Sequence, residues 1–170
     1  STELAEALVR TGRNFGVKTE AVISDMSQPL GQYVGNALEI YECVRILRGE
    51  ADGAAAATTE LSVVLAASLL VLAGAASDLE SARKRSMEVL ADGSALERFR
   101  QNVSAQGGDP NVCDRPESLL SSEIGKFPIT AESDGHVVEI DTLAIGNAVC
   151  EIGGGRTRAD DKVDHAVGFE

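Results

Sequence analysis

The chain has 170 residues, of which 44% are hydrophobic and 25% are charged, as in one folded domain or one domain with a small second one. Its formal net charge of -12 would repel phosphate backbones and anionic lipid headgroups, which argues against nucleic acids and membranes as partners. Only 4% of the residues are aromatic and Trp is absent, so we expect an aliphatic core.

The three cysteines, Cys43, Cys113 and Cys150, are odd in number and far apart, with no CxxC pair. This spacing favours reduced thiols over a disulfide framework or a zinc site. Because the N-terminus also lacks a positively charged, apolar leader, the sequence predicts a cytoplasmic protein. The chain opens at Ser1 without Met and closes on VDHAVGFE, which reads like the middle of a strand. We therefore expect a piece of a larger protein, cut at both ends.

Residues 1–106 have a mainly helical pattern with one strand. A first amphipathic helix ends near Gly12 and Gly16, and VKTEAVIS, at Val17–Ser24, then forms a β-branched run with the length of a buried strand. A helix, a strand, a short loop and a second helix follow one another closely. This order predicts part of an α/β domain.

The loop after this strand contains Pro29, Gly31 and Gly35 within seven positions. Proline fixes its own φ, and the glycines allow another group to approach the backbone closely. The helix that follows, predicted at Tyr33–Leu47, carries Glu42 beside its apolar stripe.

A buried carboxylate needs a compensating charge or solvent, and two solutions stay open for Glu42. The first is an ion pair with Arg45 or Arg48 on the same helix, for which the spacing to Arg45 is suitable. The second is a metal ion held by this carboxylate together with carbonyl groups of the preceding loop.

Residues Leu61–Ala76 form an apolar run of sixteen residues without a charge. A membrane span needs about 20 such residues, so we favour a central helix that is buried on nearly all sides. Two more helices are predicted by capping boxes, Ser77 with Glu80 and Ser94 with Glu97, separated by a C-cap glycine at Gly93.

The pattern changes after Gln106. Residues 107–128 hold three of the four prolines of the chain and lack periodicity, so we expect a crossing loop at residues 107–122. From Glu123 to Glu170 we expect a β-rich C-terminal domain. Its predicted strands are FPITAES and HVVEID, joined by a turn at Ser133–Gly135, then NAVCEIGG and a last strand from Val163.

Two other features carry no catalytic prediction. The glycine-rich GGGR at Gly153–Arg156 lacks the order of a phosphate loop and is not followed by a helix start, so we expect a turn. His136 and His165 have no neighbouring nucleophile in the sequence, so neither is predicted to be a catalyst.

Several motifs closely resemble the thymidine and pyrimidine-nucleoside phosphorylase family. The longest is DMSQPLGQYVGNALEI, at Asp25–Ile40, and the others are LRGE, SALERF, AQGGDP, SDGHVVEID, AIGNAV, GGGR and the C-terminal DKVDHAVGF. The resemblance covers essentially the whole chain.

The resemblance implies a pentosyltransferase that cleaves a pyrimidine nucleoside with phosphate, giving the free base and pentose 1-phosphate in nucleoside salvage. Family members are expected to be cytoplasmic homodimers with a small helical domain, a large α/β domain and a β-rich C-terminal domain, and to need no organic cofactor. Their phosphate and pyrimidine ligands precede a GSGAF motif that this chain lacks. We therefore expect no catalytic or substrate-binding residue here, and no activity from this chain alone.

The resemblance also implies a monovalent-cation site, usually for K⁺. The loop carbonyl groups of Leu30 and Tyr33 and the carboxylate of Glu42 are the expected ligands, with others supplied from outside this chain. An alternative from a different class is a non-catalytic scaffold or assembly module derived from the same fold. Phosphoribosyl transferases of similar fold are disfavoured by the MSQPLG and AQGGDP motifs. Related phosphorylases that act on nucleotides stay an alternative.

Overall fold

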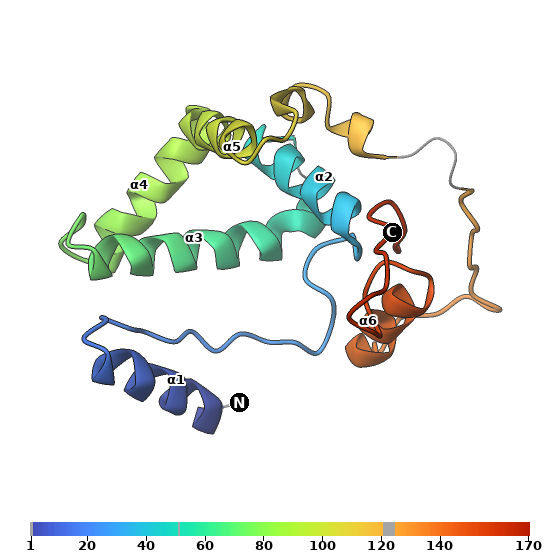
Figure 1. The fold of residues 1–170 in the computed structure, drawn as a ribbon, viewed down its shortest axis with the longest axis horizontal. Helices are drawn as coiled ribbons and strands as arrows, with labels where there is room; N and C mark the ends of the chain where they lie inside the picture. The colour runs from blue at the N-terminus through green and yellow to red at the C-terminus, as the bar shows by residue number, and fades with distance from the viewer. Residues whose placement is uncertain (1, 51, 121–124) are drawn as a thin grey trace.

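The computed structural model describes residues 2–50, 52–120 and 125–170. The described residues form the following helices: α1 (Thr2–Asn14), α2 (Asn36–Leu47), α3 (Ala56–Leu72), α4 (Leu79–Ala91), α5 (Ser94–Ala105) and α6 (Thr142–Glu151), with 3₁₀ turns η1 (Gly53–Ala55), η2 (Pro110–Cys113) and η3 (Pro116–Leu119). Figure 1 shows α2 to α5 grouped together, with α6 and the C-terminus beside the start of α2.

The core lies between helices α2 to α5 and is built from small and aliphatic residues. Val63 on α3 and Ala82 on α4 are almost completely buried where these two helices pack along each other. Across the same pair of helices, Arg83 forms a bidentate ion pair with Glu60. Val44 on α2 and Cys113 in η2 are fully buried, close to where η3 packs on α2 and η2 packs on α5. The aliphatic core therefore agrees with the composition.

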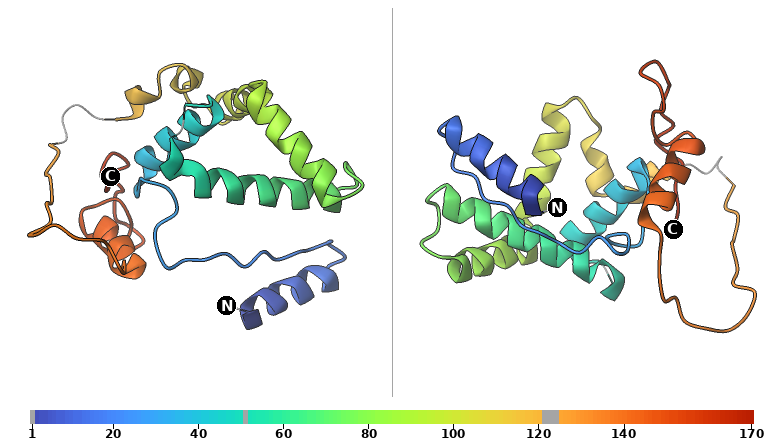
Figure 2. Two further views of the ribbon diagram at one scale, coloured as in Figure 1. Left: turned by 180° about the vertical axis from the view of Figure 1, so that it is seen from behind. Right: turned by 90° about the horizontal axis from the view of Figure 1, so that it is seen from below.

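The predicted strand at Val17–Ser24 is absent from the described structure. These residues run as an extended chain past α1, which both views in Figure 2 show. A strand needs a neighbouring strand for its backbone hydrogen bonds, and in the described ranges only the helix α1 lies alongside this segment. The single β-bridge among the described residues joins Val34 to Phe169.

The β-rich C-terminal domain is also not found in the part of the chain that the structure describes. The predicted strand NAVCEIGG instead belongs largely to α6, whose N-cap Asp141 accepts a hydrogen bond from the Ala144 N–H at 2.9 Å. A short apolar run does not distinguish a strand from a helix, and a capping aspartate resolves the ambiguity. The predicted hairpin before α6 is extended and unpaired, with Phe127 87% exposed and Val138 96% exposed. The predicted start of the domain, at residues 123–124, lies outside the described residues.

Helix α3 differs from its prediction in burial. With η1 it forms an apolar stretch, Gly53–Leu72, that is long enough to cross a membrane by length and composition alone. Core helices of soluble proteins satisfy the same criteria. Only 22% of the most apolar window is buried, and Leu69 is 66% exposed, so the expectation of burial on nearly all sides is wrong for this structure. One side of α3 is covered by α4.

The helix boundaries show which capping groups act. Asp78, one residue after the predicted Ser77, caps α4 by accepting a hydrogen bond from the Ser81 N–H at 2.8 Å. Gly93 has φ of 80°, as expected for a glycine that ends α4, and Ser94 is the first residue of α5 rather than its cap. Both helices therefore exist as predicted, but neither predicted capping serine acts as the cap.

Candidate functional site

The candidate site is the loop before α2 together with the first turns of that helix. At the start of the loop, Asp25 accepts hydrogen bonds from the backbone N–H and the hydroxyl of Ser27, both at 2.9 Å. These bonds hold the pKa of the Asp25 carboxyl below its usual value. The hydroxyl of Thr142, at the start of α6, donates to the carbonyl of Met26 at 3.2 Å. The loop is thus held by its own side chains and by a residue 116 positions away.

Glu42 lies under this loop and is only 5% exposed. Its Oε1 accepts a hydrogen bond from the backbone N–H of Gln32 at 2.9 Å. Gly31, with φ of +81°, lies directly over the carboxylate, and a Cβ at this position would overlap the carboxylate atoms of Glu42. The approach predicted for Gly31 is therefore an approach to the side chain of Glu42.

The predicted ion pair between Glu42 and Arg45 does not form in the described structure. Arg45 donates to the carbonyl of Glu50 at 3.0 Å and lies over the ring of Tyr41, 5.7 Å from its centre. Arg48 pairs with the carboxylate of Glu50 at 2.7 Å. Glu42 has no ion-pair partner within residues 2–50, 52–120 and 125–170.

Leu30 and Tyr33 lie in the loop that passes over Glu42. The Tyr33 side chain is 8% exposed, and Leu30 is 46% exposed. In the described residues, neither of their carbonyl oxygens accepts a hydrogen bond. Carbonyl and carboxylate oxygens suit hard cations, and rings of carbonyl groups are the ligands of potassium filters. The buried, unpaired carboxylate and the two free carbonyl groups therefore fit the donor set expected for a monovalent cation.

The described residues do not form a site of the zinc or two-metal type. No group of three or more His, Cys, Asp or Glu side chains within the described ranges is arranged to hold a metal ion. Burial raises the pKa of the Cys43 thiol, and nearby Glu42 and Glu39 add to this effect. Burial also raises the pKa of the Cys113 thiol. Both thiols are therefore poor nucleophiles and poor metal ligands.

The C-terminal segment closes over the far side of the same loop. Val34 and Phe169 exchange two backbone hydrogen bonds, at 2.9 and 2.8 Å. The N–H of Ala37 donates to the carbonyl of His165 at 2.9 Å, and the side-chain amide of Asn36 donates to the carbonyl of Gly154 at 2.8 Å. His165 thus contributes a backbone group here. This contact could not be predicted from the sequence, because its partners are more than 100 residues apart.

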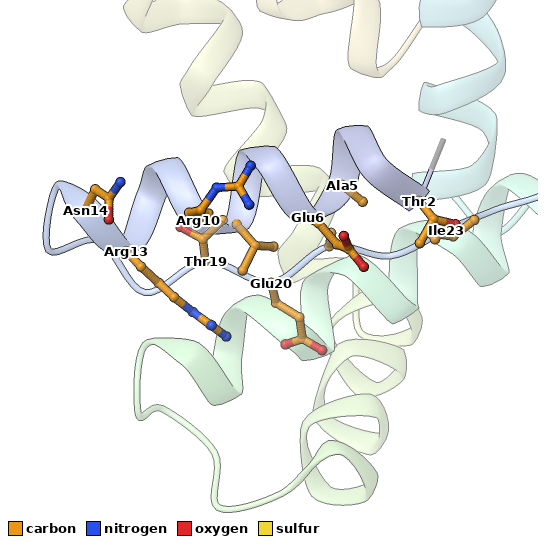
Figure 3. Close-up of a pocket in the computed structure, with 11 residues that line it drawn as sticks. Thr2, Ala5, Glu6, Arg10, Arg13, Asn14, Thr19, Glu20 and Ile23 are labelled. Atoms are coloured by element: carbon orange, nitrogen blue, oxygen red, sulfur yellow. The ribbon is translucent and has the colours of Figure 1, made fainter.

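Two hollows flank these elements. A groove of about 700 Å³ lies between α1 and the extended residues 19–23, and Figure 3 shows the side chains that both walls contribute. A Cβ on Gly12 would collide with Thr19, so this glycine lets the extended chain approach α1. A smaller hollow of about 380 Å³ lies at the loop itself, between Pro29, Gln32, Ile145 and Phe169. Four charged residues line the larger hollow, Glu6, Arg10, Arg13 and Glu20, whereas Glu170 is the charged residue that lines the smaller one.

The GGGR segment forms a turn, as predicted. The carboxylate of Asp161 accepts hydrogen bonds from the N–H groups of Thr157 and Arg158, at 3.0 and 2.8 Å, and from the Thr157 hydroxyl. These bonds lower the pKa of the Asp161 carboxyl. The backbone amides after the glycines therefore bind the protein's own carboxylate.

Comparison with known proteins places the chain in a family. The family model for the a/b domain of a glycosyl transferase family matches residues 1–96, and that for the pyrimidine nucleoside phosphorylase C-terminal domain matches residues 136–170. The pyrimidine-nucleoside phosphorylases of Staphylococcus aureus strains USA300 and NCTC 8325 / PS 47 are each 41% identical to it over 166 residues, or 98% of this chain. The chain spans 37% of the length of these relatives. It therefore belongs to the glycosyl transferase family whose a/b domain it matches, and its similarity to pyrimidine-nucleoside phosphorylases extends over nearly its whole length.

Proposed function

We propose that this chain is part of an enzyme that cleaves pyrimidine nucleosides with phosphate and releases the free base and pentose 1-phosphate. The observation that carries the proposal is the presence of both domain types, in the same order, on one chain that is 41% identical to pyrimidine-nucleoside phosphorylases over 98% of its length. The proposed enzyme is a cytoplasmic homodimer without an organic cofactor.

In this proposal, the chain contributes parts of two domains to the enzyme. Residues 1–106 belong to the α/β domain, residues 107–122 cross over, and residues 123–170 are an incomplete C-terminal domain. The strands expected at Val17–Ser24 and within residues 125–140 form when neighbouring strands of the complete protein pair with them. The groups that bind phosphate and nucleoside lie outside this chain, which alone does not turn over substrate.

In this proposal, the residues of this chain support the active site through a cation site. Glu42 and the carbonyl groups of Leu30 and Tyr33 bind K⁺, together with ligands from the rest of the protein. A bound cation supplies the positive charge that a buried carboxylate needs. The Gln32 N–H, which donates to Glu42, keeps that carboxylate oriented toward the loop. The loop is thereby fixed against α2.

The activity is tested by assaying phosphorolysis of thymidine, uridine and a pyrimidine nucleotide with the complete polypeptide that contains residues 1–170. We expect phosphate-dependent release of free base from at least one nucleoside, and no release by residues 1–170 alone. A control without phosphate separates phosphorolysis from hydrolysis. A well-folded complete polypeptide that releases no base would instead support a non-catalytic scaffold. Product from residues 1–170 alone would contradict the proposed location of the active site.

A further inference from the structure

The segment from Gly31 to Ala37 contacts two other parts of the chain, the carboxylate of Glu42 and residues 165–169. On one side, Gly31 and Gln32 lie against the carboxylate of Glu42. On the other side, Val34, Gly35 and Ala37 lie against residues 165–169 near the C-terminus. The same seven residues therefore contact both Glu42 of the proposed cation site and the docked C-terminal segment.

The contact with the C-terminal segment is made backbone to backbone. A Cβ on Gly35, whose φ is +146°, would lie 2.5 Å from the carbonyl oxygen of Val167. A Cβ on Gly168 would collide with the carbonyl oxygen of Val34. Neither position can accept a side chain unless the two segments separate, so the geometry of one segment determines the geometry of the other.

The peptide group between Tyr33 and Val34 connects the two sides directly. Its N–H donates to the carbonyl of Phe169 at 2.9 Å. All described peptide bonds are trans, and in a trans peptide the C=O and N–H groups point in opposite directions. The Tyr33 carbonyl is therefore directed away from Phe169. Rotating this carbonyl would also rotate the N–H out of its bond to Phe169.

The Tyr33 side chain adds a second connection to the same segment. Its hydroxyl lies 3.4 Å from Oε1 of Glu170, and Oε2 of Glu170 pairs with the ammonium group of Lys126 at 2.9 Å. The Tyr33 ring packs edge-on against Tyr41 of α2, with ring centres 5.6 Å apart. Tyr33 thus connects the loop, α2 and the C-terminal residue through its backbone and its side chain.

We infer that residues 31–37 couple cation binding beside Glu42 to docking of residues 165–170, so that each event strengthens the other. The inference rests on the proposed cation site. A cation that holds the Tyr33 carbonyl keeps the Val34 N–H aimed at Phe169, and the docked segment keeps the carbonyl aimed at the cation. Coupling of this kind is reciprocal, so it can be measured from either end.

The test uses the complete polypeptide that contains residues 1–170 and compares Gly168→Ala with Gly135→Ala. A Cβ at Gly135, which lies in the exposed segment before α6, would meet no atom within 4 Å, so this position is a control for the effect of the substitution itself. Potassium binding is measured by calorimetry. We expect Gly168→Ala to weaken potassium binding by roughly 5-fold or more, the lower end of typical couplings, and Gly135→Ala to leave it unchanged.

A second measurement does not depend on whether Gly168→Ala folds. Amide hydrogen exchange of residues 165–170 is compared in potassium chloride and in choline chloride at equal ionic strength. We expect potassium to slow this exchange in the unsubstituted protein, and to have no effect in Glu42→Gln. If potassium binds but exchange at 165–170 is the same in both salts, the coupling is wrong and the cation site stands. If potassium does not bind at all, both are wrong, whereas the proposed phosphorolysis is judged by its own assay.

Discussion

At the scale of single residues, the informative pair is Gly31 and Glu42. The sequence predicts that the Glu42 carboxylate lies beside the apolar stripe of its helix. Two ways of compensating its charge stay open there, an ion pair with an arginine and a bound cation. The structure excludes the ion pair with Arg45, because the Arg45 guanidinium donates to the Glu50 carbonyl and lies over the Tyr41 ring. It also explains Gly31, whose missing Cβ leaves the space that the Glu42 carboxylate occupies.

Replacing Glu42 by Gln in the complete polypeptide tests the proposed cation site. Potassium that binds only the folded protein stabilises it by about 2.7 kcal/mol at 100 times its dissociation constant. We expect this stabilisation, measured as the difference in thermal unfolding between potassium and choline chloride, to be lost in Glu42→Gln. Gln keeps an acceptor for the Gln32 N–H but removes the charge.

Glu39→Gln is the matched control for this test. Glu39 is an exposed carboxylate one turn earlier on α2, and its Oε1 accepts a hydrogen bond from the Gly35 N–H at 3.2 Å. This substitution should leave the potassium effect intact. An equal potassium effect in Glu42→Gln and the unsubstituted protein would contradict the proposal.

At the scale of elements, the crossing region after α5 is held by arginines. Arg100 on α5 forms two hydrogen bonds to the carboxylate of Asp114, at 2.8 and 2.7 Å. Arg48, the C-cap residue of α2, donates to the carbonyl groups of Cys113 and Asp114, at 3.2 and 2.7 Å. The region has no helical periodicity in its sequence, and these long-range bonds give it a defined path across two helices.

The Arg100–Asp114 pair should make stability depend on pH. The hydrogen bonds from Arg100 lower the pKa of the Asp114 carboxyl below its ordinary value of 3.8. A carboxyl with a lowered pKa stabilises the fold fully above that ordinary value, and the contribution is lost as pH falls through the lower pKa of the folded state. We therefore expect Arg100→Gln to lower the thermal midpoint near neutral pH, with a difference that shrinks on acidification.

Arg98→Gln provides the comparison on the same helix. Arg98 is exposed and forms no ion pair in the described part of the chain. Thermal unfolding of both variants is followed from neutral to strongly acidic pH. A difference between Arg100→Gln and the unsubstituted protein that stays constant across this range would show that the Asp114 carboxylate is not the group that responds to pH.

At the scale of the whole molecule, the described chain combines a packed helical core with extended segments that have no strand neighbour in it. Residues 17–24 and 125–140 run past or away from the helices (Figure 1). Their apolar side chains are largely exposed. Unpaired extended backbone leaves its N–H and C=O groups to water. Such segments gain order only from neighbouring strands.

Hydrogen exchange at residues 17–24 tests whether this segment becomes a strand in the complete protein. We expect the amides of this segment to exchange rapidly in residues 1–170 alone, because the described chain offers them no strand neighbour. In the complete polypeptide, exchange should slow by orders of magnitude, to the range of core strands. The amides of α4 serve as the internal reference in both proteins. Equally rapid exchange at 17–24 in both would contradict the α/β assignment of this segment.

Helix boundaries illustrate how far local sequence determines the elements. The helix predicted at Tyr33–Leu47 begins instead at Asn36, because Val34 is paired with Phe169 and Gly35 has a positive φ that ends any earlier helical turn. Its end at Leu47 agrees with the prediction, since Gly49 with φ of 69° follows it. The sequence predicts the end of α2 correctly because a nearby glycine ends the helix. It does not predict the start, because pairing with the distant residue Phe169 decides the conformation there.

The family, the helices α1 to α5 and the unusual carboxylate at Glu42 could be predicted from the sequence alone, because motifs, periodicity and glycine positions are local properties. The tertiary structure alone decided what Gly31 and Gly35 approach, and that residues 142–151 form a helix. It also decided that the C-terminal segment closes over the loop before α2. Gly31 approaches a side chain 11 residues further along the chain, whereas Gly35 and the C-terminal segment meet groups more than 100 residues apart. The helix at residues 142–151 is decided by competition between helix and strand in a short apolar run. None of these contacts is encoded in the periodicity of one segment.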